Sequence, residues 1–184
     1  MTKFILHGGG EGRGGKEHDA FFSEIINNLP DEAKVLCVYF AVPDELVLEK
    51  HKVYVDFFNR NNAEDKEIEL KVASKENFIE ELRWADAVYF RGGETDMLLK
   101  QIKKYKNIEE ELLKKKIVAG SSAGVYFLSN YAHSSSRDVT YKGLGILPIK
   151  SNYHYEDGKD LSRLDDLPGE LIVLMEGELI VMEK

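Results

Sequence analysis

The sequence has almost no cysteine and no long apolar run. Cys37 is the only cysteine among 184 residues, which excludes an intrachain disulfide and fits a reducing compartment. It lies in the apolar run 35–40, as expected of a buried thiol rather than a nucleophile. No apolar run approaches the ~20 residues that cross a bilayer. Residues 1–3 lead directly into a predicted strand without the apolar region of a leader peptide. We therefore expect a cytoplasmic protein without a membrane segment.

The chain also lacks a basic excess. It has 25 Lys and Arg against 33 Asp and Glu, a net charge of −8, which argues against nucleic acid as the partner. The 43% of hydrophobic and 32% of charged residues are ordinary for a globular protein. No internal repeat, low-complexity segment or domain boundary is evident, so residues 1–184 are predicted to form one domain. The sequence predicts no particular oligomeric state.

Predicted strands alternate with predicted helices through the first two thirds of the chain. The strands are expected at 3–7, 34–42, 67–72, 87–90 and 117–120, with helices near 17–29, 43–62, 77–83, 97–102 and 108–113. This alternation predicts a mostly parallel sheet with helices on both faces. After a polar loop at 134–138, short strands are expected at 139–141 and 146–149, and a hairpin of 171–175 with 179–182. In such sheets the active crevice lies at the carboxyl ends of the strands.

A Gly-x-Ser-x-Gly motif, Gly120 to Gly124, separates a buried strand from a helix-like segment at 125–129. A nucleophile on such a sharp turn leaves no room for side chains two residues to either side, which glycine satisfies. The turn would expose the Ser122 hydroxyl near the free N–H groups of the helix N-terminus. Ser122 is therefore the candidate nucleophile.

A serine nucleophile needs a base, and histidine suits that role near neutral pH. His18, His51 and His133 are expected to be solvated, because they lie on polar stretches. His7 ends the first strand beside a run of glycines, where either the crevice or backbone packing explains it. His154 follows a strand-like run and is the best-placed base.

The acid and the oxyanion donors are less constrained by the residues alone. Candidate carboxylates that would orient the base are Asp138, Glu156, Asp157 and Glu176. An oxyanion hole needs two converging N–H groups. Ala123, which follows the nucleophile, would supply one, and the Gly92-Gly93 pair can approach closely enough to supply the other.

Four segments resemble the dipeptidase E and cyanophycinase family of serine peptidases, which has the class I glutamine amidotransferase-like fold. They are 89–95 (Tyr-Phe-Arg-Gly-Gly-Glu-Thr), 119–124, 145–155 and Met175-Glu176-Gly177. The resemblance implies a three-layer α/β sandwich with a mostly parallel central sheet. It also implies Ser122 as nucleophile, His154 as base and Glu176 as its orienting acid, with an oxyanion hole formed by Gly93 and Ala123. No metal or organic cofactor is implied.

The glycine-rich turn departs from the family pattern, since Arg91 and Glu94 replace a glycine and an asparagine. Gly92 and Glu94 are thus candidate substrate-binding residues. Arg163 is a candidate counterpart of the arginine with which the dipeptidase branch recognises an amino-terminal aspartate.

The predicted function is hydrolysis of a peptide or amide bond in a small substrate through an acyl-enzyme. An amidotransferase is disfavoured because its turn would carry cysteine. One alternative is an α/β-hydrolase-type esterase with Asp138 as acid and His7 to Gly10 as oxyanion loop. The other is a non-catalytic member of the fold that binds a small metabolite.

Overall fold

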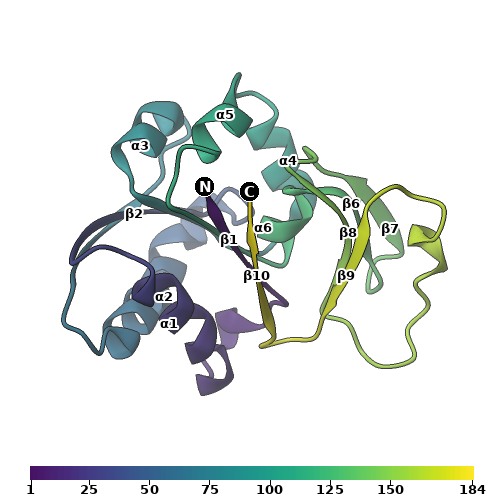
Figure 1. Ribbon diagram of the computed structural model, residues 1–184, viewed down its shortest axis with the longest axis horizontal. Helices are drawn as coiled ribbons and strands as arrows, with labels where there is room; N and C mark the ends of the chain where they lie inside the picture. The colour runs from purple at the N-terminus through teal and green to yellow at the C-terminus, as the bar shows by residue number, and fades with distance from the viewer.

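A six-stranded sheet forms the centre of the computed structural model, which describes residues 1–184 except the side chain of Arg13. Its strands are β1 (Lys3–His7), β2 (Glu32–Val38), β3 (Glu67–Val72), β4 (Ala87–Phe90), β5 (Ile117–Ser121) and β10 (Leu179–Glu183). They lie in the order β10-β1-β5-β4-β2-β3. Figure 1 shows β10 beside β1. All neighbouring pairs are parallel except β1 with β10. The predicted parallel sheet is confirmed, with β5 and β4 at its centre.

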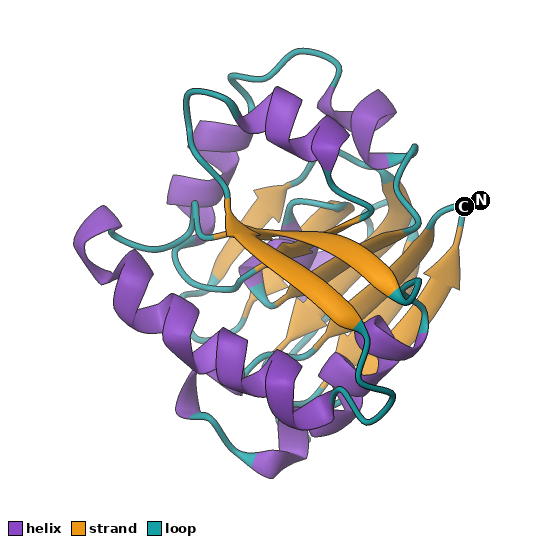
Figure 2. Ribbon diagram, turned by 90° about the vertical axis from the view of Figure 1, so that its left-hand side faces the viewer, coloured by secondary structure: helices purple, strands orange, loops and turns teal.

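Helices cover both faces of this sheet (Figure 2). One face carries α1 (Asp19–Asn27) and α2 (Val47–Asn61), and the other carries α3 (Phe78–Trp84), α4 (Thr95–Ile102), α5 (Ile108–Leu112) and α6 (Ala123–Tyr126). Short 3-10 turns span Glu11–Arg13, Lys16–His18, Asp44–Leu46 and Ser162–Leu164. Successive side chains of β2 enter opposite cores: Cys37 packs with α1 and α2, and Val38 with the other cluster. Burial raises the pKa of the Cys37 thiol to about 12, consistent with a core residue.

A second, four-stranded sheet was not predicted from the sequence. It consists of β6 (Ser129–Ser134), β7 (Val139–Lys142), β8 (Leu147–Tyr153) and β9 (Glu170–Leu174), in the order β7-β6-β8-β9. The helix-like segment expected as far as Ser129 is a single turn, and a strand follows it at once. The predicted hairpin at the end of the chain is also wrong, because β9 pairs with β8 while β10 pairs with β1. Residues 175–178 therefore cross from one sheet to the other and bring Glu176 to the carboxyl end of β1.

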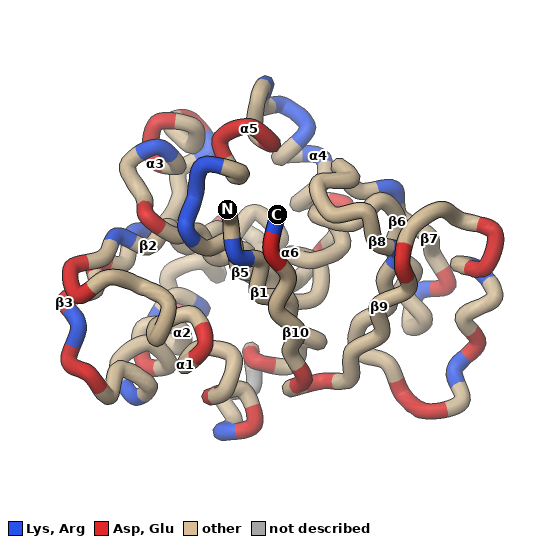
Figure 3. The backbone as a smooth tube through the Cα atoms, viewed as in Figure 1, with Lys and Arg blue, Asp and Glu red and all other residues tan. Residues whose placement is uncertain are grey.

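Charged residues of both signs are interspersed along the outer helices and loops (Figure 3). Of the helices in the described part of the chain, none is long and apolar enough to cross a membrane. The two termini lie side by side, since the backbones of Thr2 and Lys184 exchange hydrogen bonds.

Candidate active site

Ser122 occupies a strained turn between β5 and α6. Its backbone has φ 49° and ψ −111°, a combination outside the usual regions that costs on the order of 1–3 kcal/mol and is commonly found at functional sites. Its amide donates to the carbonyl of His7 at 3.1 Å. A Cβ added to Gly120 would lie 2.6 Å from the oxygen of Gly124, and one on Gly124 would lie 2.2 Å from the oxygen of Phe90. Close backbone approach thus requires both glycines of the motif.

His154 and Glu176 lie in line with the Ser122 hydroxyl. His154 Nε2 is 2.8 Å from Ser122 Oγ, and His154 Nδ1 is 2.8 Å from Glu176 Oε1. His154 follows directly after β8, and its backbone has a positive φ of 56°. Because both side chains are partly exposed, at 42% and 35%, the imidazole is accessible to a substrate.

The glycines after β1 hold His154 and Glu176 in place. Gly8 accepts the His154 amide at 3.0 Å, and Gly9 accepts the Gly177 amide at 3.2 Å. A Cβ on Gly9, where φ is +101°, would lie 2.3 Å from His154 Cε1. A Cβ on Gly10, where φ is +95°, would lie 3.1 Å from Glu176 Oε2. The backbone of this loop therefore packs directly against the imidazole and the carboxylate, a role that sequence reasoning missed although the glycine run signals close contact.

A small cavity of about 140 Å³ opens beside Ser122 and His154. Gly93, Thr95 and Arg137 contribute to its wall. Gly93 has φ +144°, and a Cβ there would lie 2.3 Å from the carbonyl oxygen of Ala41. Only glycine fits at this position, and its backbone therefore lies in the cavity wall without a side chain. Ala123 is the first residue of α6, where helical amides have no partner within the helix.

The three candidate substrate-binding residues, Gly92, Glu94 and Arg163, differ in their position relative to the cavity. Glu94 forms a two-pronged ion pair with Arg137, at 2.7 and 2.8 Å. Gly92 is buried, and a Cβ there would lie 3.1 Å from Ser122 Cβ. Arg163 is exposed and pairs with Asp138 at 3.3 Å, outside the residues that line the cavity. Among the described contacts, Asp138 therefore faces Arg163 rather than His154.

Behind Ser122 lies a buried polar cluster that the sequence did not reveal. Glu11, 3% exposed, accepts hydrogen bonds from Ser121 Oγ at 2.6 Å, Tyr89 OH at 3.2 Å and Tyr54 OH at 3.3 Å. His7 Nδ1 lies 3.6 Å from the same carboxylate. Burial raises the pKa of Glu11, but the hydrogen bond and charge of His7 and the hydrogen bond of Ser121 outweigh it and lower the pKa to about 2. Glu11 is thus a buried carboxylate anion that accepts a hydrogen bond from Ser121, the residue before the candidate nucleophile.

The same cluster extends to the loop of Gly93. Arg91 Nε donates to Tyr54 OH at 2.9 Å, and Arg91 Nη1 donates to the carbonyl of Gly92 at 2.6 Å. The cluster therefore links the ends of β4 and β5, which carry the two candidate oxyanion donors. Arg91, which replaces a glycine of the family pattern, thus helps to hold the loop that carries Gly93.

Three histidines expected from the sequence to be exposed are largely covered instead. His18 is 1% exposed, with Nδ1 3.4 Å from His7 Nε2, and burial lowers its pKa. His133 is 3% exposed, on β6 rather than in a loop. His51 is partly buried and contacts Tyr39 OH through Nδ1 at 3.0 Å. Their polar sequence neighbours gave no sign of this, because the covering residues come from distant segments.

The charge on Glu11 predicts an acid-sensitive fold. A carboxyl whose pKa is lowered from 4.5 to about 2 adds stability above pH 4.5 that is lost as pH falls from 4.5 towards 2. This is worth about 3 kcal/mol. We expect Glu11→Gln to have a lower free energy of unfolding than the wild type at pH 7. This difference in unfolding free energy should be smaller at pH 3. Urea unfolding at both pH values measures this, with exposed Glu32→Gln as control. Parallel pH dependences of the wild type and Glu11→Gln would contradict it.

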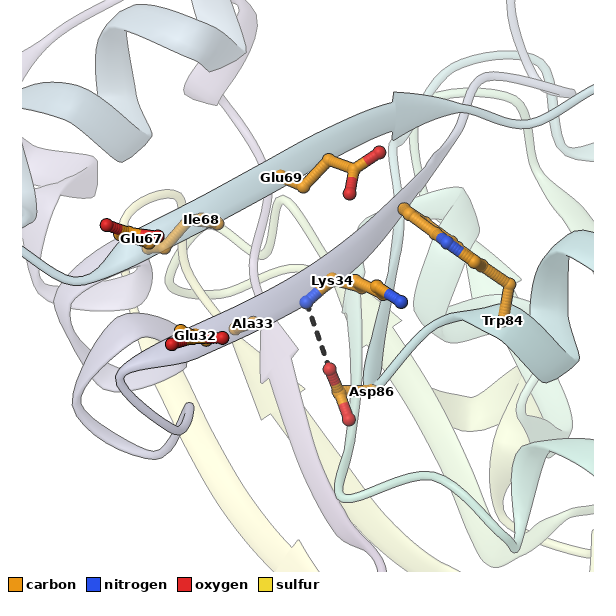
Figure 4. A pocket seen from close by; sticks show the side chains of 8 residues that line it. All are labelled: Glu32, Ala33, Lys34, Glu67, Ile68, Glu69, Trp84 and Asp86. Carbon is orange, nitrogen blue, oxygen red and sulfur yellow. Dashed lines mark hydrogen bonds between the residues drawn. The ribbon is translucent and has the colours of Figure 1, made fainter.

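A larger cavity of about 690 Å³ lies at the opposite end of the sheet (Figure 4). It is lined by the amino ends of β2 and β3 together with Trp84 and Asp86, and no serine or histidine is among its lining residues. Catalytic groups in parallel sheets gather at the carboxyl ends of the strands. The small cavity beside Ser122, not the large one, is therefore the candidate active site.

The mostly parallel sheet and the serine on its strained strand-to-helix turn define an α/β serine hydrolase. The chain belongs to peptidase family S51, whose family model matches residues 4–182, and it is a serine-type peptidase. This confirms the resemblance to the dipeptidase E family. A search of curated proteins found no match.

Solved structures share the fold. The chain is similar to a peptidase from an acI-B1 Actinobacterium, with 21% identity, a TM-score of 0.68 and coverage of 100% of this chain and 84% of the other. It is also similar to a putative peptidase E protein from Listeria monocytogenes EGD-e, with 15% identity, a TM-score of 0.64 and coverage of 100% and 99%. The predicted fold class is therefore confirmed.

Proposed function

We propose that the protein cleaves a peptide or amide bond in a small substrate with a Ser122–His154–Glu176 triad. The observation that carries the proposal is the continuous chain of two 2.8 Å contacts from Ser122 Oγ through the imidazole to Glu176 Oε1. The 140 Å³ cavity beside these residues supports a small substrate.

In the proposed reaction Ser122 Oγ attacks the substrate carbonyl and His154 Nε2 takes its proton. Glu176 holds the imidazole through Nδ1 and stabilises its positive charge. The amides of Gly93 and Ala123 receive the oxyanion. His154 then protonates the leaving amine, and a water activated by the same imidazole hydrolyses the acyl-enzyme, regenerating Ser122.

Two observations favour this proposal over an α/β-hydrolase-type esterase. The loop from His7 to Gly10 packs behind His154 and Glu176, so it is poorly placed as an oxyanion loop. The alternative acid, Asp138, is paired with Arg163. Membership of a peptidase family likewise argues against a non-catalytic binding role.

Covalent labelling tests the nucleophile. We expect a fluorophosphonate probe to add one adduct to the wild type, located at Ser122 by peptide mapping, and none to Ser122→Ala. Ser121→Ala is the matched control, because its hydroxyl is buried against Glu11 and faces away from the cavity. A wild type that stays unlabelled, or equal labelling of Ser122→Ala, would refute the assignment.

A further inference from the structure

We propose that the Glu94–Arg137 ion pair sets the substrate preference by keeping the cavity free of net charge, so that it accepts a small, polar, uncharged side chain. This inference rests on the proposed function and names the substrate class of the same site. The side chain concerned belongs to the residue whose carbonyl Ser122 attacks, since the cavity wall continues from Ser122 to Gly93, where the oxyanion would lie.

The ion pair occupies both outer nitrogens of the guanidinium. Arg137 Nη1 donates to Glu94 Oε2 at 2.8 Å, and Nη2 donates to Oε1 at 2.7 Å. Such a two-pronged arrangement is the strongest common geometry for this pair. Glu94 precedes α4, whereas Arg137 lies between β6 and β7, so the pair joins two segments that are far apart in the sequence. Arg137 lines the cavity, whereas Glu94 lies outside the lining, between the lining residues Gly93 and Thr95.

Apart from Arg137, the wall is polar but mostly uncharged. Hydroxyl-bearing Thr95, Ser134 and Ser136 line it, and Arg137 is the only Lys or Arg among its described lining residues. A volume of about 140 Å³ equals that of four or five liquid waters at about 30 Å³ each. It therefore has room for a side chain of a few heavy atoms, with hydroxyls to bond it.

A charged substrate side chain should bind in this cavity less favourably than a neutral one. A substrate carboxylate would gain little from the Arg137 guanidinium, because Glu94 already neutralises its charge. A substrate ammonium would face Arg137 in the wall. A hydroxyl or a carboxamide of similar size avoids both costs, which is how specificity arises from unfavourable as well as favourable contacts.

Glu94→Gln should therefore change the preference without removing the nucleophile. The substitution leaves the Arg137 guanidinium without its anion. The reaction rate with a substrate that carries an acidic side chain, divided by the rate with the corresponding carboxamide substrate, should therefore rise by about 10- to 100-fold. Further replacement of Arg137 by Gln should remove this gain and return the ratio to within about threefold of the wild type. Glu94 is about half exposed, so its replacement should leave the fold intact.

The test uses two aminoalkyl diphenyl phosphonates that differ only in carrying an Asn or an Asp side chain. Each phosphorus is attacked by Ser122 Oγ with loss of phenol, and the rate of adduct formation is followed by intact mass. We expect the wild type to react faster with the Asn probe and Glu94→Gln to show the stated rise for the Asp probe. Arg83→Gln, which breaks the pair of Arg83 with Glu111 away from the cavity, is the control and should leave the ratio within about twofold.

The outcomes separate this inference from the proposed function. Faster reaction of the wild type with the Asp probe, or an unchanged ratio in Glu94→Gln, would overturn the inference while fluorophosphonate labelling of Ser122 upheld the nucleophile. Failure of both phosphonates against an enzyme that the fluorophosphonate labels would also overturn it. Absence of fluorophosphonate labelling would remove the proposed function and this inference with it.

Discussion

Glu176→Gln is expected to lower kcat by about 10³- to 10⁴-fold with little change in KM. Glu176 Oε1 lies 2.8 Å from His154 Nδ1, and in the proposed reaction the carboxylate stabilises the imidazolium that forms when Ser122 loses its proton. A neutral amide of the same size gives no such stabilisation, and its NH₂ group can favour the wrong imidazole tautomer. Steady-state kinetics on a chromogenic amide substrate measure the loss.

Asp138→Asn is the matched control, because Asp138 is the acid of the alternative hydrolase arrangement. It pairs with Arg163 at the surface, and we expect kcat to stay within about threefold of the wild type. The opposite result, with Asp138→Asn crippled and Glu176→Gln active, would exchange the roles of the two carboxylates.

The parallel strands of the central sheet and the strand-to-helix turn at Ser122 were predicted well from the sequence, because both depend on local patterns. The continuous apolar run at 34–42 has the pattern of a strand buried on both faces, although the strand found there, β2, begins two residues earlier and ends four residues earlier. Strands β3 and β4 have the predicted bounds. Gly120 and Gly124 show the spacing that a close approach to the neighbouring backbone requires. The periodicity and glycine pattern are enough to place Ser122 on the turn.

The second sheet was harder to predict, because its strands pair out of their sequence order, as β7-β6-β8-β9. Residues 171–175 and 179–182 looked like a hairpin around Glu176, the simplest interpretation of two apolar runs and a tight turn. Each run pairs instead with a distant strand, β8 or β1. The identity of the acid therefore came from resemblance, and its position at His154 depends on a crossing that no local pattern encodes.

The buried cluster around Glu11 shows a second limit of sequence reasoning. Glu11 stands among glycines and charged residues, a context typical of an exposed loop. It is buried because Tyr54 and Tyr89, from α2 and β4, cover it and donate to its carboxylate. Only the three-dimensional assembly of these segments reveals that Ser121, which precedes the proposed nucleophile, donates a hydrogen bond to a buried anion.

Gly9→Ala is expected to lower kcat by about 10³-fold while the protein remains folded. The added methyl would lie 2.3 Å from His154 Cε1 and 2.5 Å from Nε2, distances that real carbon atoms do not tolerate. The backbone there is fixed by hydrogen bonds to Gly177 and His7, whereas the imidazole can rotate. The ring should therefore move away from Ser122 Oγ and no longer act as the proposed base. Kinetics and the rate of fluorophosphonate labelling should both fall.

Gly14→Ala separates this displacement from backbone strain. Gly14 also has a positive φ, +78°, but a Cβ there meets nothing within 4 Å. Both variants should lose on the order of 1 kcal/mol in thermal unfolding, since alanine resists this conformation. Only Gly9→Ala places the methyl against the imidazole, so only it should lose turnover. Equal kinetic losses in the two variants would mean that loop strain, rather than contact with His154, explains the need for glycine at position 9.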